Sequence, residues 1–361
     1  MSTENQIQEA LANVIDPNTG QSLVAARAVK NLRVEGGDVS LDVQLGYPAQ
    51  SQHAELRRNV IAALRAVPGV ANVSVQMSTK VEAHGVQRGV KLLPGVKNII
   101  AVASGKGGVG KSTTAANLAL ALAAEGARVG LLDADIYGPS QQMMMGLSGR
   151  PESTDGQTME PMENYGLQVM SIGLLMDADS PMIWRGPMAT QALEQLLRQT
   201  HWQDLDYLIV DMPPGTGDIQ LTLSQRVPLT GAVIVTTPQD IALLDARKGL
   251  KMFEKVQVPV LGIVENMAVY VCPNCGHAEH IFGSGGGSRM AGDYDVELLG
   301  SLPLDLRIRE QADSGRPSVV ADPESAAALE YKAIARKLAV KVAERVKDYS
   351  TKFPTITISE T

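Results

Sequence analysis

The most informative segment of this 361-residue chain reads Ser104-Gly105-Lys106-Gly107-Gly108-Val109-Gly110-Lys111-Ser112-Thr113. It matches G-x-x-x-x-G-K-[ST], a pattern in which backbone N–H groups surround the phosphates of a nucleotide. The apolar run 98–103 precedes it, and the Ala- and Leu-rich run 114–122, closed by Gly126, follows it. A strand, a glycine loop and a helix in this order direct a helix N-terminus toward an anion. The segment therefore predicts a nucleotide-binding α/β domain.

Each residue type in this loop has a physical role in phosphate binding. The glycines are expected to adopt φ > 0 and to approach phosphate more closely than a Cβ would allow; they are Gly105, Gly107, Gly108 and Gly110. Lys111 is expected along the β- and γ-phosphates, and the Ser112 hydroxyl is expected to complete the ligand shell of a Mg²⁺ ion. The residues from Gly105 to Thr113, with Val109 among them, are the predicted nucleotide cradle.

Composition narrows the function classes. The formal net charge of −7 argues against bulk nucleic-acid binding, which is usually accompanied by a basic patch. The first six residues lack the basic-then-apolar order of a signal peptide, and no apolar run approaches about 18 residues. We therefore expect a cytosolic protein without membrane association. The two cysteines lie three positions apart and cannot staple a chain of this size, so they call for a chemical explanation.

The first 82 residues are predicted to form a small α+β domain. Its expected elements are helices at 6–15 and 54–67 and strands at 32–35, 38–45 and 70–77. Two of these strands flank Gly36-Gly37, which is typical of a β-hairpin. Residues 83–97 contain several glycines and show no clear period, so we interpret them as a linker.

From residue 98 to residue 347 strand and helix patterns alternate, as a mostly parallel sheet flanked by helices requires. The predicted strands lie at 128–135, 167–172, 206–211, 231–238, 258–267 and 298–303, and the predicted helices at 188–199 and 324–347. In the last helix the residues spaced for packing are Leu329, Ile334, Leu338 and Val342. Residues 141–166 are interpreted as a mobile surface segment and 283–288 as a flexible loop. The tail 348–361 contains a helix-breaking proline, so it is not expected to bind membranes.

Aspartates stand at the carboxyl ends of two predicted strands, where ligands bind in sheets of this kind. Asp133 and Asp135 end one strand, and Asp211 ends another, strongly apolar one. A carboxylate in the latter position holds Mg²⁺ in nucleotide hydrolases, directly or through water. The segment 213–218 that follows is rich in proline and glycine, which suits a loop that moves when the γ-phosphate leaves. For Arg185, in an Arg-Gly-Pro segment, the sequence suggests a salt bridge and no specific role.

The cysteines occur in Val271-Cys272-Pro273-Asn274-Cys275-Gly276-His277, and three chemistries compete for them. A dithiol redox pair usually precedes a helix, whereas glycines and histidines follow here. A zinc site could recruit Cys272, Cys275, His277 and His280, although the Cys-x-His spacing is tight for a tetrahedron. An iron-sulfur cluster prefers four thiolates, of which one chain supplies two and two chains supply four.

The early lysine of the glycine loop makes the loop resemble the deviant Walker A motif of the nucleotide switches that include MinD, ParA and the nitrogenase iron protein. The resemblance implies that Lys106 reaches the partner's nucleotide across a homodimer interface that clasps two ATP molecules. It also implies that Asp135 positions the water that attacks the γ-phosphate, and that Asn266 contacts the adenine. The predicted catalytic residues are therefore Lys106, Lys111 and Asp135.

Four motifs together resemble the Mrp (ApbC) family of iron-sulfur cluster carrier ATPases. They are the glycine loop, Asp135-Ile136-Tyr137-Gly138-Pro139-Ser140, Asp211-Met212-Pro213-Pro214-Gly215-Thr216-Gly217-Asp218 and Cys272-x-x-Cys275. The resemblance covers roughly residues 94–345, and the α, β, β, α, β order of the first domain resembles a small domain of iron-sulfur assembly proteins. The resemblance to the Mrp (ApbC) family implies a [4Fe-4S] cluster that Cys272 and Cys275 of both subunits hold transiently and pass to apo-proteins. The chain lacks the extra N-terminal cysteine cluster of eukaryotic relatives.

The favoured hypothesis is thus a cytosolic, slow, switch-type P-loop ATPase that carries clusters, with ATP, Mg²⁺ and an iron-sulfur cluster as ligands. Its expected partners are a second copy of the chain, cluster scaffold proteins and apo iron-sulfur proteins. The alternative is a MinD- or ParA-like positioning switch with a structural zinc at the cysteine pair. A redox partner like the nitrogenase iron protein is a third possibility, but the cysteines of that protein are single residues elsewhere in its chain.

Overall fold

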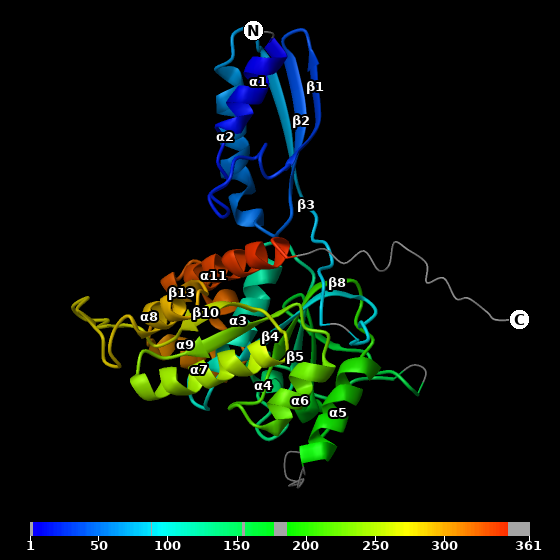
Figure 1. Ribbon diagram of the computed structural model, residues 1–361, viewed down its shortest axis with the longest axis vertical. Coiled ribbons are helices and arrows are strands. Elements are labelled where there is room, and N and C mark those ends of the chain that lie inside the picture. Colours follow the sequence, from blue (N-terminus) through cyan, green and yellow to red (C-terminus); the bar gives the residue numbers. More distant parts are fainter. Residues whose placement is uncertain (1–2, 88, 154–155, 177–185, 346–361) are drawn as a thin grey trace, which may run out of the picture.

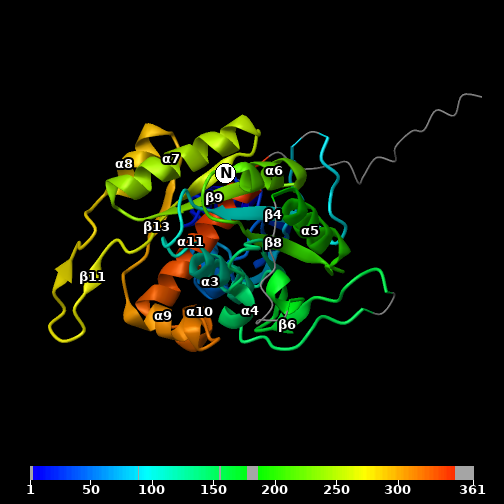
Figure 2. The ribbon, with the colours of Figure 1, turned by 90° about the horizontal axis from the view of Figure 1, so that it is seen from below.

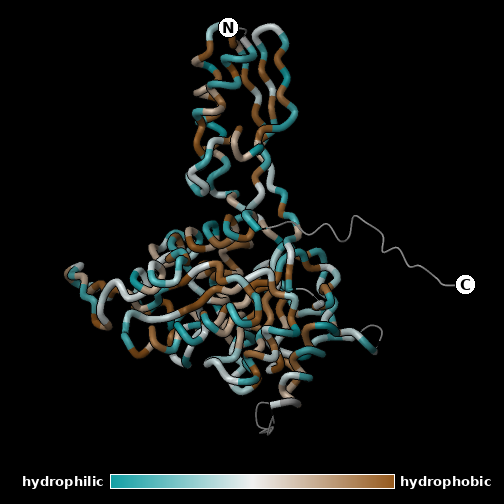
Figure 3. The backbone as a smooth tube through the Cα atoms, in the orientation of Figure 1, coloured by the Kyte–Doolittle hydropathy of each residue, from teal (hydrophilic) through white to brown (hydrophobic). Residues whose placement is uncertain are grey.

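The computed structural model describes residues 3–87, 89–153, 156–176 and 186–345. Figure 1 shows a small N-terminal domain standing on one side of a larger α/β domain. Apolar segments run through the interior of both domains, and polar segments cover their surfaces (Figure 3). None of the helices in the described ranges combines the length and apolar character that a membrane crossing requires.

The N-terminal domain packs two helices against one face of a three-stranded sheet. Its elements are α1 (Thr3–Ala12), β1 (Val29–Glu35), β2 (Asp38–Leu45), the 3-10 turn η1 (Gln50–Gln52), α2 (His53–Arg65) and β3 (Asn72–Thr79). β1 and β2 form the expected antiparallel hairpin, and β3 lies parallel to β2. Along β2, every second side chain is buried against the helices, because successive residues of a strand point to opposite faces.

The large domain is built on an eight-stranded sheet in the order β13-β10-β9-β4-β8-β5-β7-β6. The strands are β4 (Val96–Ala103), β5 (Val129–Asp133), β6 (Met162–Asn164), β7 (Leu167–Ser171), β8 (Leu205–Asp211), β9 (Gly231–Thr236), β10 (Val260–Glu265) and β13 (Leu298–Ser301). All neighbours are parallel except the edge strand β6, which pairs with β7 in the antiparallel sense. The strand that leads into the glycine loop, β4, is therefore central. This arrangement confirms the predicted fold class.

Helices cover both faces of the sheet, which explains why the central strands are buried throughout (Figure 2). One face packs against α3 (Lys111–Ala124), α10 (Ser318–Ala321) and α11 (Ala326–Ala343), with α9 (Leu306–Asp313) beside α10. The other face packs against α5 (Gly186–Gln199), α6 (Asp218–Arg226), α7 (Asp240–Lys255) and α8 (Gly286–Asp293). The short turn of helix α4 (Gln141–Met144) lies beyond the end of β5.

Several local predictions differ from the structure. Residues 283–288 were expected to be a flexible loop, but α8 begins at Gly286. A Cβ on Gly286 would collide with Leu243 and with the Pro238 carbonyl, so close packing, not flexibility, explains this glycine. The segment 141–166 contains α4 and β6. Leu329 is 47% exposed, whereas its predicted packing partners on α11 are buried. Arg185 lies outside the described residues.

The two domains meet at the C-terminal end of α3, the helix that starts in the glycine loop. Glu125 caps this end and is 1% exposed. Its carboxylate accepts hydrogen bonds from the Ser51 hydroxyl at 2.7 and 2.9 Å and pairs with Arg336 of α11. Its carbonyl accepts a hydrogen bond from the Gln50 amide at 3.1 Å. The strand β4 begins at Val96, within the predicted linker 83–97, so the connection between the domains is shorter than predicted.

Candidate functional site

The glycine loop lies at the carboxyl end of β4, between the ends of its neighbours β8 and β9. The loop ends at Gly110, which adopts φ = 82° and is the N-cap of α3. The first turn of α3 therefore directs unpaired backbone N–H groups and the positive end of the helix dipole toward the loop, which suits an anion. The structure thus forms the predicted strand, loop and helix.

The four glycines of the loop differ in backbone conformation, so the prediction of positive φ at all four is wrong. Only Gly108 (φ = 84°) and Gly110 have positive φ. Gly105 has no positive φ, but a Cβ there would overlap the backbone carbonyl group of Asp245 in α7. At Gly107 the nearest atom to an added Cβ would be the Pro214 Cβ, at an ordinary 4.0 Å. Gly105 is therefore needed for close approach to a neighbouring helix.

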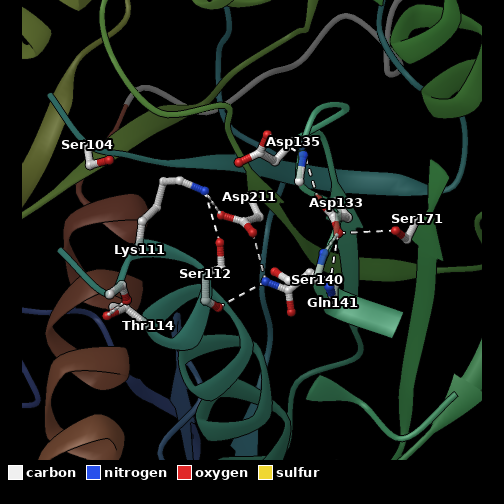
Figure 4. Close-up of polar contacts among 12 residues, drawn as sticks. Ser104, Lys111, Ser112, Thr114, Asp133, Asp135, Ser140, Gln141, Ser171 and Asp211 are labelled. Atoms are coloured by element: carbon white, nitrogen blue, oxygen red, sulfur yellow. Dashed lines mark hydrogen bonds and ion pairs between the residues drawn. The ribbon is translucent and has the colours of Figure 1, made fainter. Parts of the chain in front are cut away.

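A buried ion pair joins the loop to β8. The Lys111 ammonium, on a residue 6% exposed, contacts the carboxylate of Asp211, which is fully buried, and also donates to the Ser112 hydroxyl at 3.1 Å. Figure 4 shows these three side chains converging at the start of α3. Lysine, serine and aspartate are the groups that bind phosphate and Mg²⁺ in phosphoryl-transfer sites, so the residues present fit both ligands.

Two further carboxylates stand at the end of β5. Asp133 is buried, and its Oδ2 accepts hydrogen bonds from the Ser140 amide (2.8 Å), the Gln141 amide (2.9 Å) and the Ser171 hydroxyl (3.1 Å). Burial, together with the nearby charge of Asp211, raises the pKa of Asp133 to about 7. Burial also raises the pKa of Asp135, against the opposing effect of Lys111. Asp133 organises the turn, whereas Asp135 faces the cavity.

An open cavity of about 250 Å³ lies over the loop. Its lining includes residues of the loop, the end of β5 and the segment after β8: Ser104, Lys106, Gly107, Gly108, Gly110, Lys111, Ser112, Thr113, Asp135, Ser140, Met144 and Pro214. The predicted catalytic residues Lys106, Lys111 and Asp135 therefore share one cavity. Their roles there stay predictions.

The predicted base-reading residue supports the loop from the side of β10. The side-chain nitrogen of Asn266 donates to the Val109 carbonyl at 2.9 Å, and its oxygen accepts from the Met267 amide at 2.9 Å. A Cβ on Gly110 would collide with this amide. Asn266 thus holds the shape of the loop in this structure, and its contact with adenine stays a prediction.

The cysteines lie in a small hairpin formed by β11 (Tyr270–Val271) and β12 (Ala278–Glu279), which projects from the large domain (Figure 2). The Cys272 amide donates to the His277 carbonyl at 2.9 Å, and the Gly276 amide donates to the Cys272 carbonyl at 2.9 Å. Backbone N–H groups of Cys275 and Asn274 lower the pKa of the Cys272 thiol, which favours the thiolate. Cys275 is exposed.

The hairpin does not assemble the four-ligand zinc site that the sequence allowed. The His280 ring donates through Nδ1 to the Ala268 carbonyl at 2.7 Å. Within the described ranges, no three or more His, Cys, Asp and Glu side chains are grouped so that they could hold a metal ion. The cysteine pair of one chain is therefore an incomplete ligand set.

One polar residue of the nucleotide site was not predicted. Gln141 is fully buried, and its side-chain nitrogen donates to both the Ser112 carbonyl and the Asp211 Oδ2, at 2.9 Å each. No motif marks this glutamine. Gln141 reaches the site because its backbone amide donates to Asp133, which fixes the turn. This contact could not be predicted from the sequence.

Comparisons with known proteins identify the family of each domain. Residues 95–339 match the ParA family described as NUBPL iron-transfer P-loop NTPase, and residues 4–75 match the family described as iron-sulfur cluster assembly protein. An iron-sulfur cluster carrier protein of Pseudomonas fragi is 61% identical over 76% of this chain and 96% of its own length. The iron-sulfur cluster carrier protein of Escherichia coli strain K12 is 51% identical over 93% of this chain and 90% of its own length.

A solved structure is similar as well. The nucleotide-binding protein of Archaeoglobus fulgidus in complex with ADP is 40% identical, with a TM-score of 0.56 over 64% of this chain and 90% of its own. The two family matches cover both domains and confirm the resemblances drawn from the glycine loop, the strand-end aspartates and the N-terminal order of elements. The chain belongs to the family of NUBPL-type iron-transfer P-loop NTPases, which includes the Mrp (ApbC) iron-sulfur cluster carriers.

Proposed function

We propose that this protein is an ATP-binding and ATP-hydrolysing iron-sulfur cluster carrier that holds its cluster between two copies of the chain. One observation carries the proposal: a single chain contains a glycine loop with the buried ion pair of Lys111 and Asp211 beside it, but only two cysteines, half of the thiolates that an iron-sulfur cluster prefers. Lys111 and Asp211 lie in the buried core, whereas Cys272 is partly exposed and Cys275 is exposed. The relatives named iron-sulfur cluster carrier proteins support this reading.

For the nucleotide, the loop from Gly105 to Thr113 would enclose the phosphates, with Lys111 leaving Asp211 to lie along the β- and γ-phosphates. Ser112 and Asp211 would hold Mg²⁺, which supplies charge neutralisation between the phosphate oxygens. Asp135, on the cavity wall, would orient the attacking water. Lys106, from the same wall, would reach the nucleotide of the second copy.

For the cluster, two copies of the hairpin would supply the four thiolates that a [4Fe-4S] cargo prefers. The lowered pKa of the Cys272 thiol makes its ligand form more accessible at neutral pH. An exposed hairpin also permits transfer, because an incoming thiolate of an apo-protein or a scaffold protein can reach the cluster without unfolding the core.

Association of two copies would cover apolar side chains at the carboxyl edge of the sheet. Tyr137 follows β5, Ile241 and Leu244 lie in the first turns of α7 after β9, and Val271 follows β10. These side chains are 58%, 69%, 55% and 50% exposed, respectively. Exposed apolar residues around a functional site are typical of an interaction surface. Nucleotide binding would favour one geometry of this dimer and hydrolysis another, so that the affinity for the cluster changes.

Anaerobic purification from the cytoplasm of an expressing cell tests this proposal. We expect a coloured protein that contains iron and acid-labile sulfide, runs as a dimer when loaded, and hydrolyses ATP slowly in the presence of Mg²⁺. A colourless protein with stoichiometric zinc would favour a positioning switch. A monomer that holds a complete cluster with no added thiol would contradict the shared site.

A further inference from the structure

The side-chain amide of Gln141 has two acceptors on its nitrogen side. Gln141 is the first residue of α4 and is fully buried. Its Nε2 donates to the Ser112 carbonyl and to the Asp211 Oδ2, both at 2.9 Å (Figure 4). These contacts fix the orientation of the amide, since the opposite orientation would place an oxygen against two acceptors. Gln141 therefore links the two residues that would hold Mg²⁺.

The oxygen of the same amide has no such partner. Gln141 Oε1 is buried and accepts no hydrogen bond within the part of the chain that the structure describes. Buried acceptors are nearly always satisfied, because leaving one unpaired forfeits its hydration without compensation. The missing donor must be small, and a water molecule meets that requirement.

The neighbouring residue, Gln142, differs from Gln141 because both polar ends of its side chain have partners. Gln142 Nε2 donates to the Pro139 carbonyl at 3.1 Å, and its Oε1 lies 2.8 Å from the Ser171 hydroxyl, whose one hydrogen it shares with Asp133 Oδ2. Asp133 holds the backbone of the turn through the Ser140 and Gln141 amides. The hydrogen bonds of the Gln141 side chain go to Ser112 and Asp211, outside the turn.

We propose that Gln141 is a positioning residue of the magnesium site: its NH₂ group holds the Asp211 carboxylate and the Ser112 backbone, the two residues that would hold the ion, while a buried water satisfies its Oε1. This inference rests on the proposed ATP site. A hydrogen-bonded partner of a metal ligand fixes the orientation of that ligand, and its loss typically weakens metal binding about 10- to 100-fold. A neutral amide also suits the place, because a third carboxylate beside Asp133 and Asp211 would add repulsion.

The test compares Gln141→Met, which keeps the volume and removes both polar ends, with the matched variant Gln142→Met. Affinity for fluorescent N-methylanthraniloyl-ATP is measured in excess Mg²⁺ and in EDTA. The quantity compared is the ratio of the nucleotide Kd in EDTA to the Kd in excess Mg²⁺. For Gln141→Met we expect this ratio to fall about tenfold, while the Kd in EDTA stays within about twofold of wild type. Gln142→Met should keep the wild-type ratio.

A direct readout uses Mn²⁺ in place of Mg²⁺. Electron paramagnetic resonance of free Mn²⁺, titrated into the nucleotide complex, should show weaker ion binding for Gln141→Met and unchanged binding for Gln142→Met. If Gln141→Met does not fold, Gln141→Asn, which withdraws the amide by one methylene, should show the same loss. Normal ion binding in whichever of these variants folds would overturn the inference. Wild-type protein whose nucleotide affinity ignores Mg²⁺ would instead overturn the magnesium part of the proposed function.

Discussion

The nucleotide site and the cysteine hairpin differ in how much of each one chain provides. Around Asp211 the polar groups are buried and held by residues from β5, β8, α3 and α4. In the hairpin, every residue from Pro273 to Ile281 is exposed, and the flanking strands are two residues long. The chain therefore buries and pairs the polar groups of its candidate nucleotide site and leaves the turn that contains its cysteines exposed.

This difference follows from what each ligand demands. Phosphoryl transfer depends on groups that are oriented before the reaction, which requires a rigid, desolvated setting. A cargo that is received and handed on needs ligands that a second protein can reach, and such segments come from the less stable parts of a fold. Substitutions in the two regions should therefore separate effects on the free energy of unfolding from effects on cluster loading.

The largest effect is expected for Lys111→Ala. Removing the ammonium leaves the buried Asp211 carboxylate without its counter-charge, which costs about 3–5 kcal/mol in comparable sites. Urea denaturation of the nucleotide-free protein measures this loss. The double variant Lys111→Ala/Asp211→Ala should recover part of it, because no unpaired charge remains. A single variant as stable as wild type would show that the pair does not stabilise this region.

A smaller effect is expected for Gly105→Ala. The added Cβ would overlap the carbonyl group of Asp245, so α7 or the loop must shift, at a cost of about 1–3 kcal/mol. Gly107→Ala is the matched control in the same loop, because its Cβ meets only ordinary contacts. Equal stability of the two variants in urea would mean that the loop and α7 are less closely packed in solution.

Gly105 also illustrates what the sequence could reveal. The motif identified the loop and predicted its ligand, because the strand, the glycines, the lysine and the serine lie next to one another in the sequence. It could not show that Gly105 faces a helix about 140 residues later, which led to the wrong expectation of positive φ. Gln141 is similar, since its partner Asp211 is 70 residues away. Local patterns predict elements, whereas these contacts depend on how distant elements pack.

The helix α7 is different, because a local signal for it existed. Apolar residues recur with helical spacing along it and are buried in the structure: Ala242, Leu243, Ala246, Leu250 and Phe253. In α8 the run of glycines concealed the helix, since glycine is typical of loops. There Gly286 and Gly287 are required by close contacts with Pro238 and Glu265. Composition alone cannot distinguish a glycine that permits packing from one that permits motion.

An intermediate effect tests how far the rigid region extends. Ser51→Ala removes a hydroxyl that donates to the buried Glu125 at the far end of α3, and we expect a loss of about 1 kcal/mol. Ser40→Ala, on the exposed face of β2, is the control within the same domain. Hydrogen exchange of the α3 amides should increase in Ser51→Ala only. An unchanged exchange pattern would confine the rigid region to the nucleotide site.

The smallest effect on stability is expected for Cys272→Ser. The side chain lies in an exposed hairpin, so the free energy of unfolding should change by less than about 0.5 kcal/mol. Loading should nevertheless fail, because a serine hydroxyl does not replace the thiolate ligand that an iron-sulfur cluster requires. Iron and sulfide analysis after anaerobic reconstitution measures this loss, and Asn274→Ala, in the same turn, should load normally. Full iron content in Cys272→Ser would remove this cysteine from the cluster site, whereas a large loss of stability would show that the hairpin belongs to the folded core.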